Sequence, residues 1–465
     1  MIPSTLGLYT DFYELTMAQA HFNDQRHTTS SGFDYFFRSN PFNAGYTIFA
    51  GLSDLLDGLE YFHFSDEDCA FLSSEGFQDD FVDYLRDFKF SGSIYSMREG
   101  EIVFPNEPIV RVEAPVVEAQ ILETFLLNIL NFESLIATKT NRIVQAARGK
   151  AVLDFGLRRS QGFGGFHASK AAIIGGAQAT SNALSGRVFD IPVSGTQAHA
   201  WIQSFDSELE AFRSYARSFP DKSVMLVDTY DTLKSGIPNA ITVAKELEEK
   251  GHKMVGIRLD SGDLAYLSKE ARKMLDEAGF DYVKIAASNQ LDEHLIRSLN
   301  DQGAEIDLYG VGTSLITGQP DAALDGVYKM CSFDDTPRMK ISENIEKVTL
   351  PGLKSVCRLT GDGVFRGDVI QQIDEANPEK MIHPHQEKKQ LQIDGFESEP
   401  LLSEVVKNGN VLDGAMKTAK EASAYRDERL RKVTDEYKRF ENPHIYKIGI
   451  SEKLWDAREN WMNQL

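Results

Sequence analysis

The chain has 465 residues, a net charge of −21 at pH 7, and 42% hydrophobic and 26% charged residues. This length allows two or three domains, and the composition is that of an ordinary globular protein. The negative charge argues against nucleic acid and anionic membranes as partners, because both attract basic surfaces.

The sequence also indicates where the protein works. Cysteines are few and far apart, which excludes a disulfide framework and fits a reducing compartment: they are Cys69, Cys331 and Cys357. The N-terminal MIPSTLG lacks the basic and apolar regions of a signal peptide. The apolar stretch 116–132 contains several polar residues and is expected to be an amphipathic core helix. We therefore expect a cytoplasmic protein.

Residues 1–115 are predicted to form an α+β domain. A first helix is expected to begin at Thr10 or Asp11, because apolar residues then recur at helical spacing. Alternating aromatic and polar residues predict strands within 31–52 and 90–114, on either side of an acidic helical stretch.

Residues 116–325 are predicted to form an α/β domain. Pro115 is expected to begin a helix, and a second helix is expected over 134–147. From residue 151 short apolar strands alternate with helices at the spacing of βα units, and one of these helices is expected over 197–219.

Parallel strands in such units form either a barrel or a doubly wound sheet. Polar residues follow six of the predicted strands. A barrel would place all six strand ends around one mouth, so the pattern favours an irregular, incomplete α/β barrel.

Residues 326–465 are predicted to form a mixed C-terminal domain. Short strands come first, and residues 376–400 look like a loop because they are rich in Pro and Lys. A charged helix is expected from about residue 413 to Asn442, with its charges on a solvated face.

One predicted strand end combines a turn of small residues with a histidine. Ser194, Gly195 and Thr196 precede a helix start at which His199 stands. Backbone N–H groups and the positive end of the helix dipole favour an anion there. His199 is then suited to act as a base, to donate to a phosphate or to be phosphorylated. The alternative is a histidine that only packs on a helix face.

Two further strand ends carry charged side chains. Arg258 and Asp260 have the same parity on an extended chain, so one is suited to an anion and the other to a metal or a sugar hydroxyl. The simpler alternative is an Arg–Asp ion pair in a loop. Asp228 repeats the acidic pattern one strand earlier, and carboxylates of this kind bind Mg²⁺.

The first and last strand ends complete the predicted pocket. Arg158 offers a guanidinium fork for phosphate or carboxylate, and Phe155 offers an aromatic face. Gly312 lets the backbone approach a ligand, and Thr313 adds a hydroxyl, as in phosphate sites after late barrel strands. Together these residues predict a pocket for a multiply phosphorylated anion.

Eight segments resemble the nicotinate phosphoribosyltransferase family and occur in its order. They span roughly residues 8–320 and read TDFYELTMA (10–18), FFRSNPF (36–42), LDFGLRRSQG (153–162), ATSNALSG (179–186), SGTQAHAW (194–201), VDTYDTL (227–233), GIRLDSGDL (256–264) and YGVGTSLITG (309–318). The C-terminal part resembles the extra domain of the bacterial form. The resemblance implies an N-terminal α/β domain, an incomplete barrel of the TIM type, and a homodimer with active sites near the subunit interface.

The resemblance also implies a reaction. Nicotinate would be joined to phosphoribosyl pyrophosphate, with Mg²⁺ and coupled ATP hydrolysis, to give nicotinate mononucleotide in NAD salvage. His199 matches the histidine that ATP phosphorylates in the family. Tyr13, expected to come from the partner subunit, and Phe155 match the two faces of the pyridine site. Thr196 and Arg258 match further nicotinate-site positions.

The remaining matches concern the phosphoribosyl group and substrate choice. Thr313 and Gly312 match the turn that contacts its phosphate, and Mg²⁺ is expected to bind through substrate phosphates. The other residues expected in this pocket are Arg158, Asp228 and Asp260, the last on ribose hydroxyls. Ser181 stands where nicotinamide-using relatives have an aspartate, so no carboxylate repels nicotinate there. The alternatives are a related enzyme for nicotinamide or quinolinate, and a barrel protein that has lost catalysis.

Overall fold

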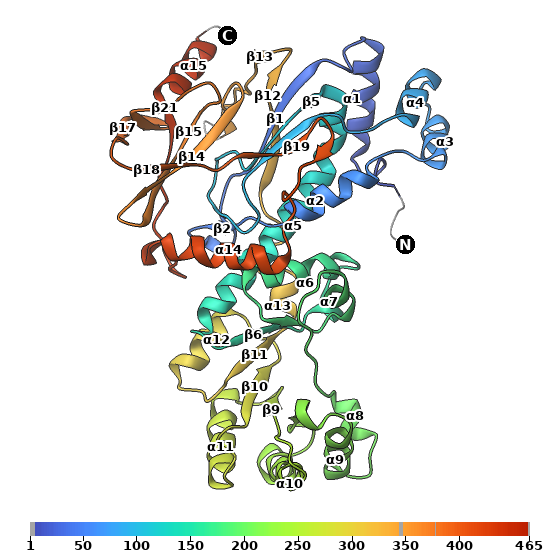
Figure 1. The fold of residues 1–465 in the computed structure, drawn as a ribbon, viewed down its shortest axis with the longest axis vertical. Helices are drawn as coiled ribbons and strands as arrows, with labels where there is room; N and C mark the ends of the chain where they lie inside the picture. Colours follow the sequence, from blue (N-terminus) through green and yellow to red (C-terminus); the bar gives the residue numbers. More distant parts are fainter. Residues whose placement is uncertain (1–4, 344–346, 377, 464–465) are drawn as a thin grey trace. The chain divides into compact units, whose positions relative to one another are not determined.

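The chain forms two compact units. The computed structural model describes residues 5–343, 347–376 and 378–463. Unit 1 comprises Met1–Leu135 and Ala323–Leu465, and unit 2 comprises Ile136–Ala322. Residues 1–4 lie outside the described residues. They belong to the N-terminal stretch MIPSTLG, which was not expected to be a signal peptide. Where the sequence predicted three domains, with boundaries after residues 115 and 325, the structure groups both outer segments in unit 1 (Figure 1).

The first sheet of unit 1 explains why its two segments fold together. Strand β1 (Ser30–Phe37) lies between β5 (Val110–Pro115) and β12 (Gly326–Phe333), antiparallel to both. On the other side of β5, β3 (Ser93–Ser96) pairs with β19 (Ser403–Lys407). The edges of the sheet are β13 (Thr336–Pro337) and β20 (Asn410–Val411). N-terminal and C-terminal strands therefore share one hydrogen-bonded sheet and one hydrophobic core.

A second sheet of unit 1 comes from the C-terminal segment alone. Its order is β17-β16-β21-β15-β14-β18. These strands are β14 (Lys354–Gly361), β15 (Val364–Gln372), β16 (Lys380–His383), β17 (Gln386–Gln392), β18 (Glu397–Pro400) and β21 (Ile448–Ser451). Three of them lie within 376–400, so the prediction of a loop there is wrong. Strand β17 reads QEKKQLQ and is almost wholly exposed, so it lacks the apolar alternation that identifies a strand.

The charged C-terminal helix is α14 (Ala419–Lys432), which is shorter than predicted, and α15 (Glu452–Met462) follows it. Thr418 and Glu421 form a capping box at the start of α14, which explains why the helix begins there. The prediction that its charges are solvated is wrong for Arg426 and Arg429, because both side chains are buried.

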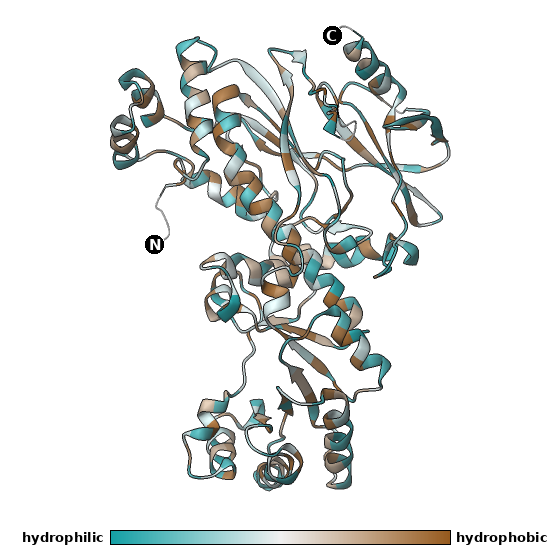
Figure 2. Ribbon diagram, turned by 180° about the vertical axis from the view of Figure 1, so that it is seen from behind, coloured by the Kyte–Doolittle hydropathy of each residue, from teal (hydrophilic) through white to brown (hydrophobic). Residues whose placement is uncertain are grey.

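One continuous helix, α5 (Val116–Ala146), replaces the two helices predicted after residue 115. Pro115 is the last residue of β5, where it pairs with Ser30, rather than the first residue of the helix. By length and composition α5 could cross a membrane, but 61% of its most apolar part is buried, as in a core helix. Leu122 and Leu126 are fully buried in the core of unit 1, and Figure 2 shows the apolar residues along this helix.

The other N-terminal predictions are confirmed. Helix α1 (Phe12–Asn23) begins directly after Asp11, as its apolar spacing predicted. Strands flank the acidic helical region, and the remaining elements are β2 (Thr47–Ile48), α2 (Leu52–Gly58), α3 (Asp66–Ser74), α4 (Asp79–Arg86) and β4 (Ile102–Val103).

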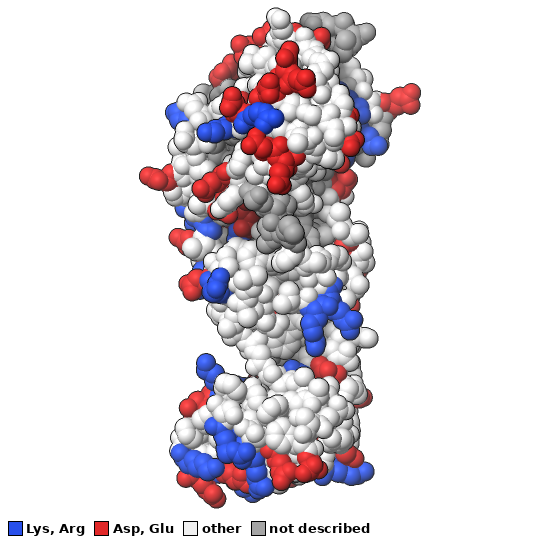
Figure 3. Space-filling view, turned by 90° about the vertical axis from the view of Figure 1, so that its right-hand side faces the viewer, with Lys and Arg blue, Asp and Glu red and all other residues white. Residues whose placement is uncertain are grey.

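On the face drawn in Figure 3, Lys and Arg are interspersed with Asp and Glu.

Unit 2 is built on a six-stranded parallel sheet in the order β7-β6-β11-β10-β9-β8. Its strands are β6 (Ala151–Asp154), β7 (Ala179–Thr180), β8 (Val224–Leu226), β9 (Gly256–Leu259), β10 (Lys284–Ser288) and β11 (Leu308–Val311). A parallel bridge from Thr180 to Val193 extends the β7 edge, and no pairing among the described residues joins that edge to β8. The predicted incomplete α/β barrel is thereby confirmed.

Helices follow the strands of unit 2 as predicted, with one difference. The helix expected over 197–219 is broken into α8 (His199–Gln203) and α9 (Glu208–Ser218), because Ser207 caps a new helix through the N–H of Glu210. The others are α6 (Gly164–Gly175), α7 (Ala183–Val188), α10 (Ile237–Glu248), α11 (Leu264–Glu277), α12 (Glu293–Asp301) and α13 (Thr313–Ile316). The loops that join strand to helix gather at the carboxyl edge of the sheet.

Candidate active site

His199 lies at the carboxyl edge of the unit 2 sheet and is oriented through both ring nitrogens. Its Nδ1 is 3.0 Å from Oγ1 of Thr229, and its Nε2 is 3.6 Å from Oδ2 of Asp260. Thr229 and Asp260 follow β8 and β9, so two neighbouring strand ends hold the ring. The imidazole side chain is 39% exposed and therefore accessible to a ligand. A histidine that only packs on a helix face would have no such partners.

The two carboxylates beside His199 belong to one hydrogen-bond network. Oδ2 of Asp228 accepts from the backbone N–H of Asp260 and from the Ser261 hydroxyl, each at 2.7 Å. Oδ1 of Asp260 accepts from the Ser288 hydroxyl. Oδ1 of Asp228 is buried and has no hydrogen-bond partner among the described residues. Because buried acceptors are rarely left unpaired, this atom is suited to a sugar hydroxyl or a hydrated cation.

Mg²⁺ fits this part of the site. The ion prefers hard oxygen ligands and usually keeps several waters, with one or two carboxylates and substrate phosphates. Asp228 offers the unpaired oxygen, and the Asp260 side chain is 32% exposed, which leaves room for water. These two residues would hold the ion together with the phosphates of a bound substrate.

Arg258 connects the SGTQAHAW turn to strand β9. Its Nη1 donates to Oγ1 of Thr196, while its Nε is buried without a hydrogen-bond partner in the described chain. Burial lowers the pKa of Arg258, an effect that Asp260 and Asp228 oppose and that the positive charge of Arg158 increases. Arginine stays charged nonetheless. The unused donor, with a second cation near it, is suited to bind a carboxylate or a phosphate.

The alternative of an Arg–Asp ion pair is not realised. Arg258 and Asp260 form no ion pair in the described structure, because Asp260 points to His199 and Ser288 while Arg258 points to Thr196. The two side chains are thus left available for separate ligand groups.

The ends of β6 and β11 pack closely through glycine. The N–H of Phe155 donates to the Val311 carbonyl at 2.8 Å, and a Cβ atom at Gly310 would overlap the Phe155 ring. Glycine therefore allows the ring to lie against the backbone of β11. Gly312 directly precedes α13, and Thr313 at the start of that helix is exposed.

Asp154 holds the turns after β6 and β7. Its carboxylate is fully buried and accepts from the Gly156 N–H, the Thr180 hydroxyl and the Ser169 hydroxyl at 2.7–2.9 Å. Burial raises the pKa of Asp154, and these three donors oppose the rise. Its carbonyl also accepts from the N–H of Ser181 at 2.8 Å, which leaves the Ser181 side chain exposed. Arg158 lies in the exposed 3₁₀ turn that follows β6.

Tyr13 is the one predicted site residue outside unit 2. It lies in the first turn of α1 in unit 1 and is 52% exposed. Partial burial and the carboxylates of Glu14 and Glu123 raise the pKa of Tyr13, so the phenol stays neutral. The structure therefore places the ten predicted residues of unit 2 in or after the strands of one parallel sheet, whereas Tyr13 belongs to the other unit.

Two hydroxyl residues, Thr229 and Ser288, belong to the site although they are not among the residues predicted for it. Thr229 positions the His199 ring, and Ser288 holds the Asp260 carboxylate. Both lie at strand ends, which is the same signal that identified Asp228 and Asp260. Hydroxyl residues are common in loops, however, so only the observed contacts separate these two from the rest.

Comparisons with known proteins cover most of the chain. Family models described as the nicotinate phosphoribosyltransferase N-terminal domain, family and C-terminal domain match residues 8–131, 151–366 and 353–458. Nicotinate phosphoribosyltransferase of Bacillus subtilis is 45% identical, over 98% of this chain and 94% of its own length. Nicotinate phosphoribosyltransferase pncB2 of Mycobacterium tuberculosis is 38% identical, over 96% of this chain and 92% of its own.

Solved structures resemble the whole chain. Human nicotinic acid phosphoribosyltransferase has a TM-score of 0.87 at 29% identity, covering 97% of this chain and 99% of its own. Nicotinate-nucleotide pyrophosphorylase from Pyrococcus furiosus has a TM-score of 0.72 at 23% identity, covering 92% and 95%, and thus shares the fold. The extent and identity of these matches establish that the chain belongs to the nicotinate phosphoribosyltransferase family.

Proposed function

We propose that this protein joins nicotinate to phosphoribosyl pyrophosphate, giving nicotinate mononucleotide and pyrophosphate in the cytoplasmic salvage of NAD. The observation that carries the proposal is the 45% identity to a nicotinate phosphoribosyltransferase over 98% of the chain. The site supports it, because an arginine with a free donor, two carboxylates and a histidine share one edge of the sheet.

The reaction requires an oriented ring and a neutralised leaving group. The pyridine nitrogen attacks the anomeric carbon while the bond to pyrophosphate breaks, through a transition state of oxocarbenium character. Arg258 and Thr196 bind the nicotinate carboxylate, and Phe155 stacks on one face of the ring. Tyr13 of a partner subunit stacks on the other face in the homodimer. Orientation of this kind supplies much of the rate enhancement of two-substrate enzymes.

The phosphoribosyl pyrophosphate is held by the strand ends around His199. Arg158 and the Gly312–Thr313 turn bind phosphate, and Asp228 and Asp260 bind ribose hydroxyls and the Mg²⁺ that accompanies the pyrophosphate. When bound, the ion offsets the negative charge that develops on the leaving group. Exposed Ser181 offers no charge that would repel nicotinate.

We also propose that ATP is coupled to the reaction through His199. The terminal phosphoryl group passes from ATP to a ring nitrogen, ADP leaves, and water later releases inorganic phosphate from the phosphohistidine. Thr229 and Asp260 hold the exposed ring for this transfer. The added phosphoryl group brings up to two negative charges, which reorganise the cations around the substrate.

A product assay tests both proposals. The full-length protein is incubated with phosphoribosyl pyrophosphate, Mg²⁺ and nicotinate, nicotinamide or quinolinate, each with and without ATP, and products are separated by anion-exchange chromatography. We expect nicotinate mononucleotide from nicotinate, with a higher yield in the presence of ATP. Preference for nicotinamide would refute the argument from Ser181. No product from any of the three would identify a protein that has lost catalysis.

A further inference from the structure

A large cavity in unit 1 shares no residue with the site described above. Its volume is about 1230 Å³, which is somewhat larger than the roughly 300–1,000 Å³ of most small-molecule pockets. Its walls come from the end of β1, the β16–β17 hairpin, the segment before β21, and α15. The FFRSNPF motif, which the proposed reaction does not use, contributes Phe36, Arg38 and Asn40 to the lining.

The lining of this cavity is basic although the protein is acidic. Among the residues that the structure describes, eight lysines and arginines line it, against four aspartates and glutamates, whereas the chain as a whole carries a charge of −21. Two of the acids are neutralised locally, Asp34 by Lys354 at 2.8 Å and Glu459 by Arg458 at 2.9 Å. The cations that remain therefore set a positive potential inside the cavity.

Arg38 is the strongest indication of a ligand. Its backbone N–H donates to the Asp325 carbonyl at 3.2 Å, which fixes the residue at the end of β1. The Nε atom of its guanidinium is buried and has no hydrogen-bond partner, and its side chain has no ion pair, among the residues that the structure describes. A buried charged donor without an acceptor is costly, so the site is suited to a bound anion.

Three aromatic residues of the cavity already have partners. Phe104 and Tyr446 stack on each other with ring centroids 3.6 Å apart, and Arg458 covers Trp455 at 4.3 Å. One face of each of these rings is therefore engaged, so the cations of the lining are better placed than these rings to recognise a ligand.

We propose that this cavity binds a small phosphate-bearing anion through Arg38, with Lys447, an exposed lysine of the same lining, as a second cation. Arginine is suited to phosphate because its planar fork donates two parallel hydrogen bonds. The ligand binds in addition to the substrates of the proposed reaction, so each chain has two anion sites.

Titration calorimetry of the full-length protein with inorganic pyrophosphate tests the proposal. We expect two sites per chain in the wild type. Arg38→Met weakens one of them at least tenfold and leaves the other unchanged, whereas Arg158→Met weakens the other, proposed substrate site. The matched control is Arg86→Met, which changes an exposed arginine of the same unit and leaves both sites intact.

The possible outcomes separate this proposal from the proposed function. If Arg38→Met binds pyrophosphate at two sites with the affinities of the wild type, the cavity proposal is wrong. It is also wrong if the wild type has a single site whose affinity Arg38→Met does not change. Failure of Arg158→Met to weaken any site would count only against the substrate assignment. If Arg38→Met does not fold, the exposed Lys447→Met variant is expected to weaken the same site by at least threefold, and an unchanged site contradicts the proposal. Adenosine, which lacks a phosphate, is expected not to bind the cavity, and its binding there would overturn recognition by charge.

Discussion

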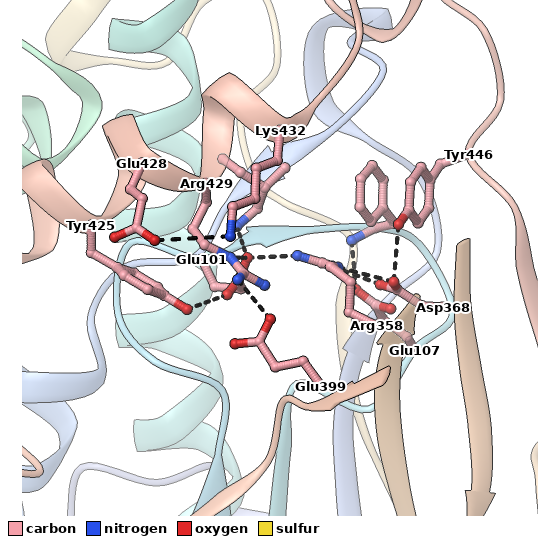
Figure 4. A network of polar contacts seen from close by, with 12 residues as sticks. Glu101, Glu107, Arg358, Asp368, Glu399, Tyr425, Glu428, Arg429, Lys432 and Tyr446 are labelled. Atoms are coloured by element: carbon pink, nitrogen blue, oxygen red, sulfur yellow. Dashed lines mark hydrogen bonds and ion pairs between the residues drawn. The ribbon is translucent and has the colours of Figure 1, made fainter. Parts of the chain in front are cut away.

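The charged network around Arg358 in unit 1 and the candidate site of unit 2 both gather charged side chains from distant parts of the sequence, but the network pairs opposite charges that the site leaves apart. In unit 1, the fully buried Arg358 pairs with Glu101 and Asp368, each at 2.6 Å, and Arg429 reaches Glu101 at 2.8 Å (Figure 4). In the site of unit 2, neither Asp228 nor Arg258 forms an ion pair with a described residue, and each keeps a buried atom without a hydrogen-bond partner among those residues. Paired charges hold segments together, whereas partly unpaired charges leave capacity for a ligand.

The unit 1 network connects segments that are far apart in sequence. Arg358 lies on β14, Asp368 on β15 and Arg429 on α14, and all three meet near the N-terminal β3–β4 region that carries Glu101. Burial and the nearby Asp368 raise the pKa of Glu107 well above its usual range, an effect that the positive charge of Arg358 opposes. The network thereby joins the two halves of unit 1 in their buried interior.

Removing the central arginine is expected to have the largest effect. Arg358→Met leaves Asp368 buried without its cation and removes one of the two cations of Glu101, which keeps Arg429. Breaking a buried pair in this way costs about 3–5 kcal/mol in the free energy of unfolding. Urea unfolding followed by circular dichroism measures the change. The matched control is Arg366→Met on β15, whose exposed pair with Asp362 contributes less than about 1 kcal/mol. A loss below that value for Arg358→Met would show that the network does not stabilise unit 1.

The second expected effect concerns the histidine of unit 2. His199→Ala removes the acceptor for the phosphoryl group, so the ATP-stimulated rate falls about 10³-fold and weak, ATP-independent synthesis remains. Steady-state assays with and without ATP measure it. His252→Ala, which alters another half-exposed histidine of unit 2, is the control and leaves the ATP effect unchanged. Full ATP stimulation in His199→Ala would exclude the phosphohistidine.

Glu14 is an exception to the pairing in unit 1. Its side chain is 1% exposed and forms no ion pair with a described residue, and burial together with Glu123 raises the pKa of Glu14 to about 7. Below pH 4.5 the group is protonated in both the folded and the unfolded state. As the pH rises through 7 the folded state must ionise it, so the stability contributed by the neutral acid is lost.

Glu14→Gln removes this dependence on pH. The variant and the wild type should therefore be equally stable at pH 4, and the variant should gain up to about 3 kcal/mol by pH 8. Urea unfolding at both values measures the difference. The exposed Glu75→Gln variant is the control, and a gain that is the same at both pH values would contradict a raised pKa.

A smaller effect is expected at the arginine of unit 2. Arg258→Ala removes the charged donor for the nicotinate carboxylate, so the KM for nicotinate should rise about 10²-fold, because a lost charge-assisted hydrogen bond costs up to about 3 kcal/mol. Initial rates at varied nicotinate measure it. Arg213→Ala, which breaks a partly exposed ion pair on α9, is the control. An unchanged KM in Arg258→Ala would place the carboxylate elsewhere.

Local signals in the sequence identified most of the candidate site. The alternation of apolar strands with helices predicted a parallel sheet, and the carboxyl ends of parallel strands meet at one edge. His199, Asp228 and Asp260 are therefore close to one another because of their positions at strand ends, which can be read from a single sequence. The hydroxyls of Thr229 and Ser288 follow the same rule, but their contacts depend on side-chain directions that no spacing specifies.

What the sequence by itself determined is the alternation of strands and helices in unit 2, its incomplete barrel and the chemical type of its strand-end residues. These follow from periodicity and turn residues, which act over a few neighbouring positions. Only the tertiary structure decided that the C-terminal segment joins the N-terminal sheet and that Arg358 and Arg429 are buried. Strand pairing and charge burial depend on partners hundreds of residues away, and an arginine that is solvated or buried looks the same in the sequence.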